Sequence, residues 1–193
     1  MDDTFFTLLP PEYNEILQAS KEIAFDMPSD LQTGSLLKTM VASKPSARVL
    51  ELGTGTGLAT SWLLAGMDEQ SELVTIENNE EVLSIAKKYL ADNRIRFVKE
   101  DGYQWILSNK EEPFDIIFAD AMPGKYELFN EAWQLLKENG FYIIDDMLPQ
   151  PNWPGGHEEK VSNFITMLEN KQDAVLTKMN WSTGMIVVVK KRD

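Results

Sequence analysis

The sequence predicts an α/β protein with a mostly parallel sheet, helices on both faces and an antiparallel hairpin at the end of the chain. Apolar runs rich in β-branched residues alternate with segments of helical period, the pattern of strands joined by crossover helices. A glycine-rich loop follows the first run, and only five residues separate the last two runs. Because a link that short requires an antiparallel pair, five parallel strands are expected to end in a hairpin.

The expected strands are short and spread along the whole chain. They are Ala47–Leu52, Leu73–Glu77, Ile95–Lys99, Phe114–Ala119, Phe141–Asp145, Ala174–Met179 and Met185–Lys190. The segments of helical period that lie between strands are Leu58–Met67, Glu80–Ala91, Gly102–Ser108 and Tyr126–Lys137. The alternation indicates crossover connections between parallel strands, and we find no internal repeat.

Two further helices are expected before the first strand. Ile16, Leu17 and Ile23 recur at helical spacing, as do the apolar residues of 36–41, and Pro28 separates the two segments. We expect residues 1–45 to form a helical segment that packs on the sheet. A chain of 193 residues buries roughly 70% of its unfolded surface, which fits a single domain over residues 1–193.

Charge and composition restrict the partners. The chain has 18 Lys and Arg against 31 Asp and Glu, a net charge of −13, which repels nucleic-acid backbones and anionic membranes. It has no cysteine, and no apolar stretch approaches the ~20 residues that span a bilayer. Met1, Asp2 and Asp3 have the wrong charge for a secretory signal, so the cytoplasm is the expected compartment. A small neutral or cationic molecule is the expected partner.

The glycine-rich loop is the strongest functional signal. Residues 49–57 read Val-Leu-Glu-Leu-Gly-Thr-Gly-Thr-Gly, so Gly53, Gly55 and Gly57 stand at alternate positions between a strand and a helix. Glycine permits a sharp turn and close approach to a ligand, and the following helix points its positive end at the same place. The loop therefore predicts a nucleotide-type cofactor. The dinucleotide fingerprint needs glycine at its first, third and sixth positions, and this loop does not have that spacing.

Carboxylates stand at the ends of the next strands, where ligands bind in an open parallel sheet. Glu77 follows Gly57 by 20 residues, the distance at which an acidic side chain accepts hydrogen bonds from ribose hydroxyls. Asp101 is placed to contact an adenine amino group, with Gly102 permitting close approach, and it is nearly as well suited to cap the next helix.

Three more carboxylates follow the fourth and fifth expected strands: Asp120, Asp145 and Asp146. Neighbouring strands bring them into one cleft, where they raise one another's pKa unless a cation or a hydrogen-bond donor lies among them. Magnesium or another divalent cation is one solution. It prefers oxygen ligands and would lower the pKa of an acceptor hydroxyl bound beside it.

The loop after Asp146 is rich in proline and glycine and precedes a helix. Trp153 in this loop offers a flat wall for an acceptor, or equally anchors the loop to the core. His157 is the only histidine of the chain. It is a candidate general base or metal ligand. Alternatively, His157 is a surface residue at the start of a helix with no catalytic role.

The chain resembles the catechol and caffeoyl-CoA type O-methyltransferases, a metal-dependent class I family with a Rossmann-like, seven-stranded sheet. The resemblance spans nearly the whole length. It rests on Ser29–Leu37, Glu51–Gly57, Glu77–Asn78, Asp101, Phe118–Asp120 with Lys125–Tyr126, and Ile144–Leu148. It implies methyl transfer from S-adenosyl-L-methionine (SAM) to a hydroxyl group of a small molecule, with Asp120, Asp145 and Asp146 as the ligands of the divalent ion.

The expected site residues fall into two groups. Those expected to bind SAM are Glu51, Gly53, Thr54, Gly55, Gly57, Glu77, Asn78, Asp101, Gly102 and Asp120. Those expected in catalysis are Asp120, Lys125 and His157, and either Lys125 or His157 is the base. The chain differs from the family pattern in having Asp146 in place of Asn, and in placing Lys125 five residues after Asp120 instead of three.

Three alternative functions stay open at this point. A methyltransferase acting on tRNA or another macromolecule is opposed by the acidic charge, and a non-catalytic SAM-binding protein by the carboxylates at successive strand ends. An NAD-dependent oxidoreductase is opposed by the glycine spacing and by the closing hairpin. Relatives with this sheet often form dimers, so a homodimer is preferred.

Overall fold

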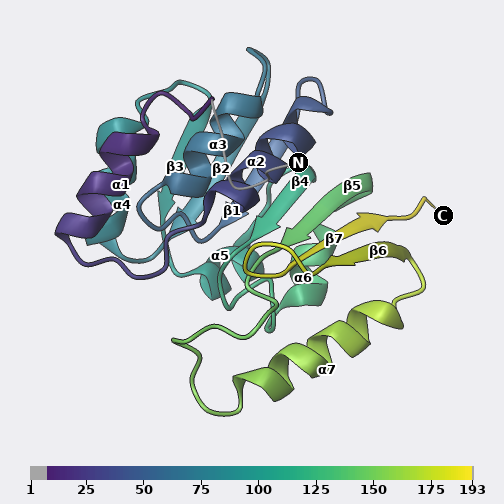
Figure 1. Cartoon of the computed structure of the whole chain (residues 1–193). Coiled ribbons are helices and arrows are strands. Elements are labelled where there is room, and N and C mark those ends of the chain that lie inside the picture. The colour runs from purple at the N-terminus through teal and green to yellow at the C-terminus, as the bar shows by residue number, and fades with distance from the viewer. Residues whose placement is uncertain (1–7, 193) are drawn as a thin grey trace.

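The computed structural model describes residues 8–192, in which one seven-stranded sheet is flanked by helices (Figure 1). The strand order is β3-β2-β1-β4-β5-β7-β6. The strands are β1 (Arg48–Leu52), β2 (Glu72–Glu77), β3 (Ile95–Lys99), β4 (Phe114–Ala119), β5 (Leu136–Ile144), β6 (Ala174–Met179) and β7 (Met185–Lys190). Met1, Asp2 and Asp3, on which the expectation about a secretory signal rests, lie outside the described residues.

The pairing confirms the expected sheet. Strands β1 to β5 run parallel, and β7 pairs antiparallel with both β5 and β6. The chain proceeds outward from β1 to β3, then returns to the other side of β1 with β4. The β1–β4 boundary is therefore the point where the winding reverses, and the carboxyl ends of these two strands are where a ligand is expected.

Helices cover both faces of the sheet. The first group, α1 (Tyr13–Glu22), α2 (Leu31–Ala42), α3 (Leu58–Gly66) and α4 (Glu80–Tyr89), lies on one side. The second group, α5 (Gly102–Ser108), α6 (Phe129–Gln134) and α7 (His157–Glu169), lies on the other. Right-handed crossovers produce this division, because the connections change direction after β3. Among the described residues, no helix is both long and apolar enough to cross a membrane.

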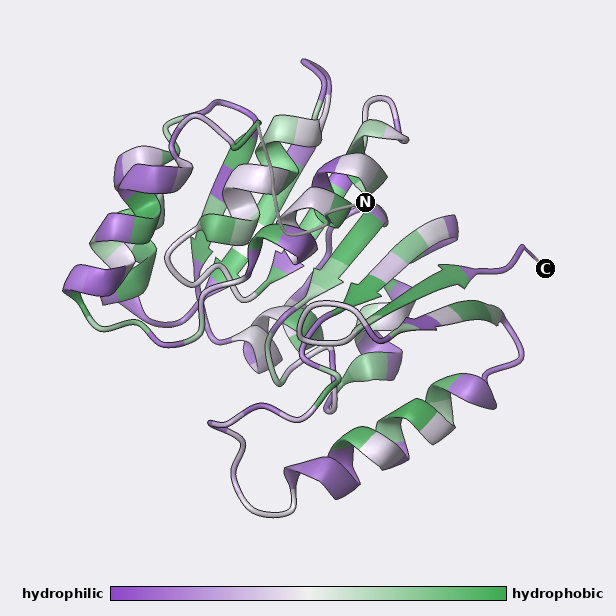
Figure 2. Ribbon diagram, in the orientation of Figure 1, coloured by the Kyte–Doolittle hydropathy of each residue, from purple (hydrophilic) through white to green (hydrophobic). Residues whose placement is uncertain are grey.

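Each face of the sheet has its own hydrophobic core. Val49 of β1 belongs to the core that includes residues of α2 and α3, whereas its neighbour Leu50 belongs to the core that includes residues of α5, α6 and α7. Side chains alternate along a strand, so central strands covered on both faces are apolar at nearly every position. Figure 2 shows this as hydrophobic colour along the central strands.

The N-terminal helices pack in two layers. Helix α2 contributes Leu37 and Val41 to the core on the sheet, as expected. Helix α1 instead packs on α3 and α4, and the ring of Tyr13 meets Trp62 edge-on at 6.0 Å between centroids. That residues 1–193 form a single domain stays a prediction.

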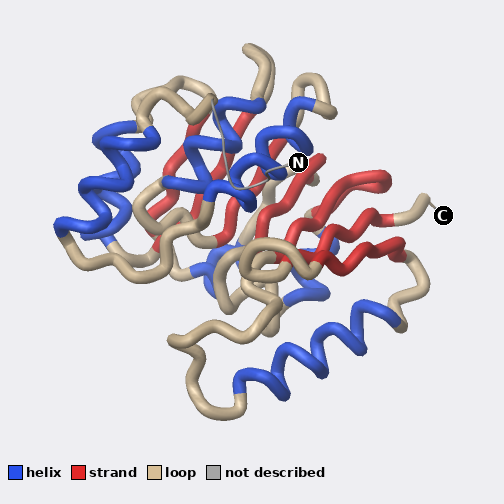
Figure 3. The backbone as a smooth tube through the Cα atoms, in the orientation of Figure 1, coloured by secondary structure: helices blue, strands red, loops and turns tan. Residues whose placement is uncertain are grey.

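One expected helix is wrong in its bounds. Tyr126–Lys137 was expected to be helical, but α6 covers only Phe129–Gln134, and β5 already begins at Leu136. Residues 123–127 form a turn in which Gly124 has φ +82° and its N–H donates to the carbonyl of Glu127 at 2.7 Å. The hydroxyl of Tyr142 donates to the Gly124 carbonyl and so ties this turn to the sheet. Figure 3 shows the turn and the long β5–α7 connection as loops.

Candidate functional site

A cleft of about 310 Å³ opens at the carboxyl ends of β1, β2, β3 and β4. Its walls are the residues at the end of each strand and just beyond: Leu52–Gly53, Ile76–Asn78, Glu100–Tyr103 and Ala121–Pro123. The structure thus brings together five of the residues that the sequence predicts for the cofactor: Gly53, Glu77, Asn78, Asp101 and Gly102. Tyr103, Met122 and Pro123 also line the cleft, and no sequence motif had singled them out.

The glycine loop is shaped by contacts within the protein. Gly53, Gly55 and Gly57 have φ values of +102°, +53° and +95°. A Cβ atom at Gly53 would lie 2.8 Å from the carbonyl oxygen of Asp120, and one at Gly57 would lie 2.9 Å from the Cβ of Ala86. Two of the glycines are therefore required by the close approach of other chain segments, whereas the sequence had suggested the approach of a ligand.

Four of the backbone N–H groups of residues 53–57 donate to partners within the protein. The N–H groups of Gly53 and Thr54 both donate to the carbonyl of Ile76 at 3.1 Å. The N–H of Gly55 donates to Oε2 of Glu77 at 2.9 Å, and that of Gly57 donates to the carbonyl of Thr54 at 3.0 Å. A loop that binds phosphates presents free N–H groups to them, so this loop suits a cofactor without phosphates.

Glu77 is held by three backbone donors at the end of β2. Besides the bond from Gly55 to Oε2, its Oε1 atom accepts from the N–H groups of Asn78 at 3.0 Å and Asn79 at 2.9 Å. A carboxylate oxygen accepts two hydrogen bonds, so Oε2 retains one lone pair beyond these three bonds. The side chain lines the cleft in a fixed orientation and can accept one further donor there.

Asp101 caps helix α5 and also lines the cleft. Its Oδ1 atom accepts from the N–H groups of Tyr103 at 3.0 Å and Gln104 at 3.2 Å, which confirms the capping alternative. Oδ2 takes no part in these two bonds. Gly102 allows the loop after β4 to come near, since a Cβ there would lie 2.7 Å from Cγ of Pro123.

Glu51 points away from the cleft, toward α3. The side chain is fully buried, and its Oε2 atom accepts hydrogen bonds of 2.6 Å from the hydroxyls of Thr60 and Thr75. Thr54 then donates to the Thr75 hydroxyl at 2.5 Å, because the Thr75 proton is already given to Glu51. Oε1 has no hydrogen-bond partner within the described part of the chain. Burial outweighs the two hydroxyl bonds and raises the pKa of Glu51 to about 8.

This raised pKa predicts that stability falls as the pH rises from about 5 to 8. In that range Glu51 is ionised in the unfolded chain and protonated in the folded one, so the folded state binds more protons and the free energy of unfolding decreases with pH. The upper limit is roughly 1.4 kcal/mol per pH unit. Urea unfolding at pH 5.5, 6.5 and 7.5 measures it, and Glu51→Gln should flatten the dependence because it is neutral throughout.

Glu15→Gln is the matched control, because Glu15 lies exposed on α1. It should leave the pH dependence of unfolding as in the wild type. A Glu51→Gln variant whose dependence equals that of this control would show that Glu51 is ionised in the folded protein near neutral pH.

A second group of charges lies beside the cleft. Because β4 and β5 are parallel neighbours with Ala119 opposite Ile144, the next residues, Asp120 and Asp145, stand side by side. The ammonium of Lys125 is buried and lies 3.9 Å from Oδ1 of Asp120. Burial raises the pKa of both carboxyls, that of Asp145 to about 6. Repulsion from Asp145 adds to the rise at Asp120, repulsion from Asp146 adds to that at Asp145, and Lys125 opposes both shifts. We call Asp120, Lys125 and Asp145 the acid–lysine cluster.

Hydroxyl groups from distant segments reach this cluster. The hydroxyl of Thr183, in the turn between β6 and β7, donates to Oδ1 of Asp145 at 2.5 Å. The same oxygen accepts the N–H of Asp146 at 2.9 Å, and Ser29, just before α2, donates to Oδ2 of Asp120 at 3.5 Å. The sequence analysis missed Thr183, because a single threonine in a hairpin turn carries no chemical signal.

The three aspartates do not form a metal site in this arrangement. Within residues 8–192, no group of three acidic or histidine side chains is arranged to hold a metal ion. One oxygen of Asp145 already accepts two hydrogen bonds, and Asp120 faces the ammonium of Lys125. Asp146 follows with φ +57°. The donor set around Asp120 and Asp145 therefore suits the resident lysine better than an added divalent ion.

His157 begins helix α7 and packs between two aromatic rings. Its centroid lies 4.6 Å from that of Trp153 and 5.1 Å from that of Tyr126, which it meets edge-on. Burial and the nearby Lys125 and Lys160 lower its pKa, and Asp146 only partly opposes them, which favours the neutral form of the ring. Trp153 is partly buried against the hydrophobic core, which bears out its anchoring role.

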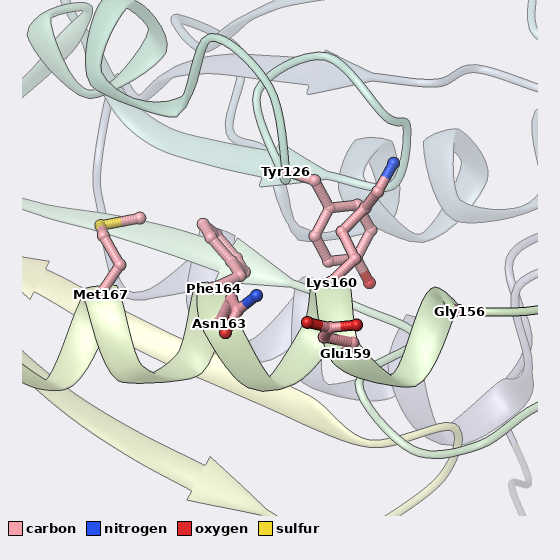
Figure 4. Close-up of a pocket in the computed structure, with 7 residues that line it drawn as sticks. All are labelled: Tyr126, Gly156, Glu159, Lys160, Asn163, Phe164 and Met167. Carbon is pink, nitrogen blue, oxygen red and sulfur yellow. The ribbon is translucent and has the colours of Figure 1, made fainter.

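A second hollow, of about 500 Å³, lies on the outer side of Tyr126 along α7 (Figure 4). It is lined by Tyr126, Gly156, Glu159, Lys160, Asn163, Phe164 and Met167. Figure 4 shows the Tyr126 ring above the first turns of α7. The ammonium of Lys125 lies 5.5 Å from the centroid of the Tyr126 ring, so Tyr126 borders both this hollow and the acid–lysine cluster. Burial raises the pKa of Tyr126, and the nearby Asp146 and Asp120 add to this shift.

A comparison with known protein families identifies the family to which this site belongs. A family model described as a methyltransferase domain matches residues 50–147, from within β1 to just beyond the aspartate pair after β5. The chain belongs to this methyltransferase domain family. The matched segment holds the glycine loop, the cleft and all of the acid–lysine cluster, so the family assignment covers the part of the fold on which the site is built.

Individual relatives agree with this assignment of the methyltransferase domain. A provisionally named O-methyltransferase of Mycobacterium avium (strain 104) is 28% identical over 138 residues, which are 67% of this chain and 62% of the relative. The chain thus spans less than two thirds of the length of that curated relative.

Solved structures confirm the fold. The O-methyltransferase TomG from Streptomyces achromogenes, in complex with SAM, matches with a TM-score of 0.82 at 22% identity, over 94% of this chain and 90% of TomG. An O-methyltransferase from Bacillus cereus, in complex with S-adenosylhomocysteine (SAH), matches with a TM-score of 0.80 at 23% identity, over 96% of this chain and 93% of that one. At such identities the likeness shows the Rossmann-like methyltransferase fold.

Proposed function

We propose that this chain is a SAM-dependent methyltransferase that methylates a hydroxyl group of a small molecule. One observation carries the proposal: the cleft, which suits a cofactor without phosphates, lies next to the acid–lysine cluster at the β1–β4 boundary. TomG and the Bacillus cereus enzyme, which share the fold, hold SAM and SAH. SAM supplies an electrophilic methyl group on its sulfonium, so the protein needs only to position an acceptor hydroxyl and take its proton.

Four residues of the cleft are proposed to bind SAM. Glu77 would accept a hydrogen bond from a ribose hydroxyl with the remaining lone pair of Oε2. Asp101 would accept a hydrogen bond from the adenine amino group with Oδ2. Asn78 and Gly102 stand next to these carboxylates in the cleft wall. NAD has a pyrophosphate, and the engaged N–H groups of the glycine loop leave little to bind it, which supports SAM over NAD.

The acid–lysine cluster is proposed to act on the acceptor. Asp120 would take the hydroxyl proton, since burial raises its pKa and makes it a stronger base than an ordinary carboxylate. The buried ammonium of Lys125 would stabilise the negative charge that develops on the acceptor oxygen. His157 and Tyr126 would form a wall of the acceptor site, and His157 would not act as the base.

A small acceptor fits the charge of the molecule better than a macromolecule. The net charge of −13 and the carboxylates around the cleft would repel tRNA or another polyanion. A homodimer and a cytoplasmic location stay predictions from the sequence.

We also infer that Lys125 supplies the positive charge that the resemblance assigned to a divalent ion. Turnover should therefore be unchanged, within about twofold, after dialysis against EDTA and after later addition of Mg²⁺. The physical reason is that a lysine already neutralises the carboxylates at this site. Initial rates of SAH formation, with catechol as acceptor probe, measure it. Loss of activity on chelation and its return with Mg²⁺ would restore the three aspartates as metal ligands.

Calorimetric titration with SAH, run beside NAD, tests the function as a whole. We expect a dissociation constant in the micromolar range for SAH and no measurable heat from NAD. The Glu77→Gln variant should weaken SAH binding about 10-fold, because an amide cannot keep all of the hydrogen bonds of the carboxylate. Tighter binding of NAD than of SAH would contradict the proposed methyltransferase function and favour an oxidoreductase.

A further inference from the structure

The turn between β6 and β7 is fixed to the segment that carries the aspartate pair. The N–H of Met147 donates to the carbonyl of Gly184, and the N–H of Leu148 donates to that of Thr183, both at 2.9 Å. A Cβ atom at Gly184, which has φ +86°, would lie 2.5 Å from the backbone nitrogen of Leu148. The turn therefore lies directly against the chain as it leaves β5.

The side chain of Thr183 sets the orientation of the Asp145 carboxylate. Its hydroxyl and the N–H of Asp146 both donate to Oδ1, at 2.5 and 2.9 Å. The carboxylate is 2% exposed, so water is a poor substitute for either donor. Two donors on one oxygen leave Oδ2 as the atom outside these bonds.

The same turn is connected to the N-terminal side of the site. Ser182 donates to Oδ2 of Asp30, whose Oδ1 caps α2 by accepting the N–H of Thr33 at 2.8 Å. The hydroxyls of Thr33 and Ser182 are 3.1 Å apart. Ser29, next to the cap, donates to Asp120. Both carboxylates of the acid–lysine cluster thus receive a hydroxyl from segments that this network joins.

A purely structural turn has no need of this arrangement. Valine has the shape of threonine and would satisfy the packing of the turn, but it would leave a buried carboxylate without its shortest donor. Ser182 stands at φ +59°, where a residue other than glycine is uncommon, and its hydroxyl is directed to Asp30. The hydroxyl groups of Ser182 and Thr183 therefore have a function in the turn that packing alone does not require.

We propose that Thr183 is a positioning residue for methyl transfer, because its hydroxyl holds the carboxylate of Asp145 beside Asp120 and Lys125. The acceptor oxygen then meets a cluster whose charges are fixed in place before it binds. This inference rests on the methyltransferase function proposed above. Thr183 acts by orienting the Asp145 carboxylate, so its loss should lower turnover and leave cofactor affinity unchanged.

The test compares Thr183→Val, which removes the hydroxyl, with Thr183→Ser, which keeps it. Thr177→Val is the matched control, since Thr177 lies exposed on β6 of the same hairpin. We expect Thr183→Val to lower kcat for SAM and catechol about 10- to 100-fold, with the KM for SAM and the SAH affinity unchanged. Thr183→Ser should stay within about threefold of the wild type. Equal kcat in Thr183→Val and the control, or equal losses in the valine and serine variants, would overturn the proposal.

Crystal structures of the wild type and both variants keep this test independent of the proposed function. The Asp145 carboxylate should keep its orientation in Thr183→Ser and turn away in Thr183→Val, and an unchanged carboxylate in Thr183→Val would overturn the inference. Should Thr183→Val not fold, Thr183→Ala takes its place in both measurements. A wild type that fails to bind SAH would refute the methyltransferase function, while the carboxylate orientation would still decide the role of Thr183.

Discussion

Replacing Asp120 with asparagine should lower turnover about 1000-fold and leave SAH affinity within about threefold of the wild type. Asparagine has the volume of aspartate but cannot take the proton of an acceptor hydroxyl. The side chain lies at the end of β4 beside Lys125, outside the residues that line the cofactor cleft, so cofactor binding should survive. Initial rates of SAH formation with catechol and calorimetric titration with SAH measure the two effects separately.

Glu131→Gln is the matched control for this change, because it replaces an exposed carboxylate of α6 by its amide. It should behave as the wild type in both measurements. Burial and the neighbouring Asp145 raise the pKa of Asp120, so wild-type turnover should fall with decreasing pH well above pH 4, where an ordinary carboxylate titrates. An Asp120→Asn variant as active as the control would exclude Asp120 as the base.

The fold was predictable where one physical signal dominated. Strands β3, β4, β6 and β7 and helix α5 have the bounds that hydrophobic period and turn residues indicate. The start of the expected helix Tyr126–Lys137 was not predictable, because residues 123–127 form a turn that depends on Gly124 and on the hydrogen bond that Tyr142 donates to its carbonyl. The fifth strand was expected at Phe141–Asp145, but β5 already begins at Leu136 and runs through Asn139 and Gly140 with a shift in register against β4.

The site was predictable to the extent that it follows from topology. Parallel strands place the residues after their carboxyl ends at one edge, so Glu77, Asp101, Asp120 and Asp145 gather there as expected. The direction of Glu51 follows from strand alternation, since it shares the side of Val49 and faces Thr60 on α3. The hydrogen bonds that Thr183 and Ser29 donate join segments that are distant in the sequence, which no local pattern encodes.

The expected divalent ion stays a prediction, and the path of the backbone after β4 bears on it. Three carboxylates in one cleft need a cation or a hydrogen-bond donor among them, and the sequence suggested a divalent ion as one solution. Lys125 stands five residues after Asp120, and the turn at Gly124 brings its ammonium back to that carboxylate. A buried lysine and a bound ion satisfy the same electrostatic demand, and the proposal that Lys125 takes the place of the ion rests on this path of the backbone.

Replacing Gly53 with alanine should lower the free energy of unfolding by roughly 1–3 kcal/mol and weaken SAH binding more than about 10-fold. At φ +102° a residue with a Cβ atom is strained. The added methyl group would also lie 2.8 Å from the carbonyl oxygen of Asp120, so either the glycine loop or the end of β4 must move. Urea unfolding and calorimetric titration with SAH measure the two effects.

Gly155→Ala is the matched control, since a Cβ there would have no heavy atom within 4 Å, and it should resemble the wild type in both measurements. Turnover is the more sensitive readout for Gly53→Ala. Gly53 lines the cleft and touches the backbone of Asp120, so one displacement disturbs both the cofactor site and the base. A Gly53→Ala variant that binds SAH and turns over like Gly155→Ala would mean that the close packing of the glycine loop on β4 is irrelevant to the site. The coupling of cofactor cleft and acid–lysine cluster through this contact would then be wrong.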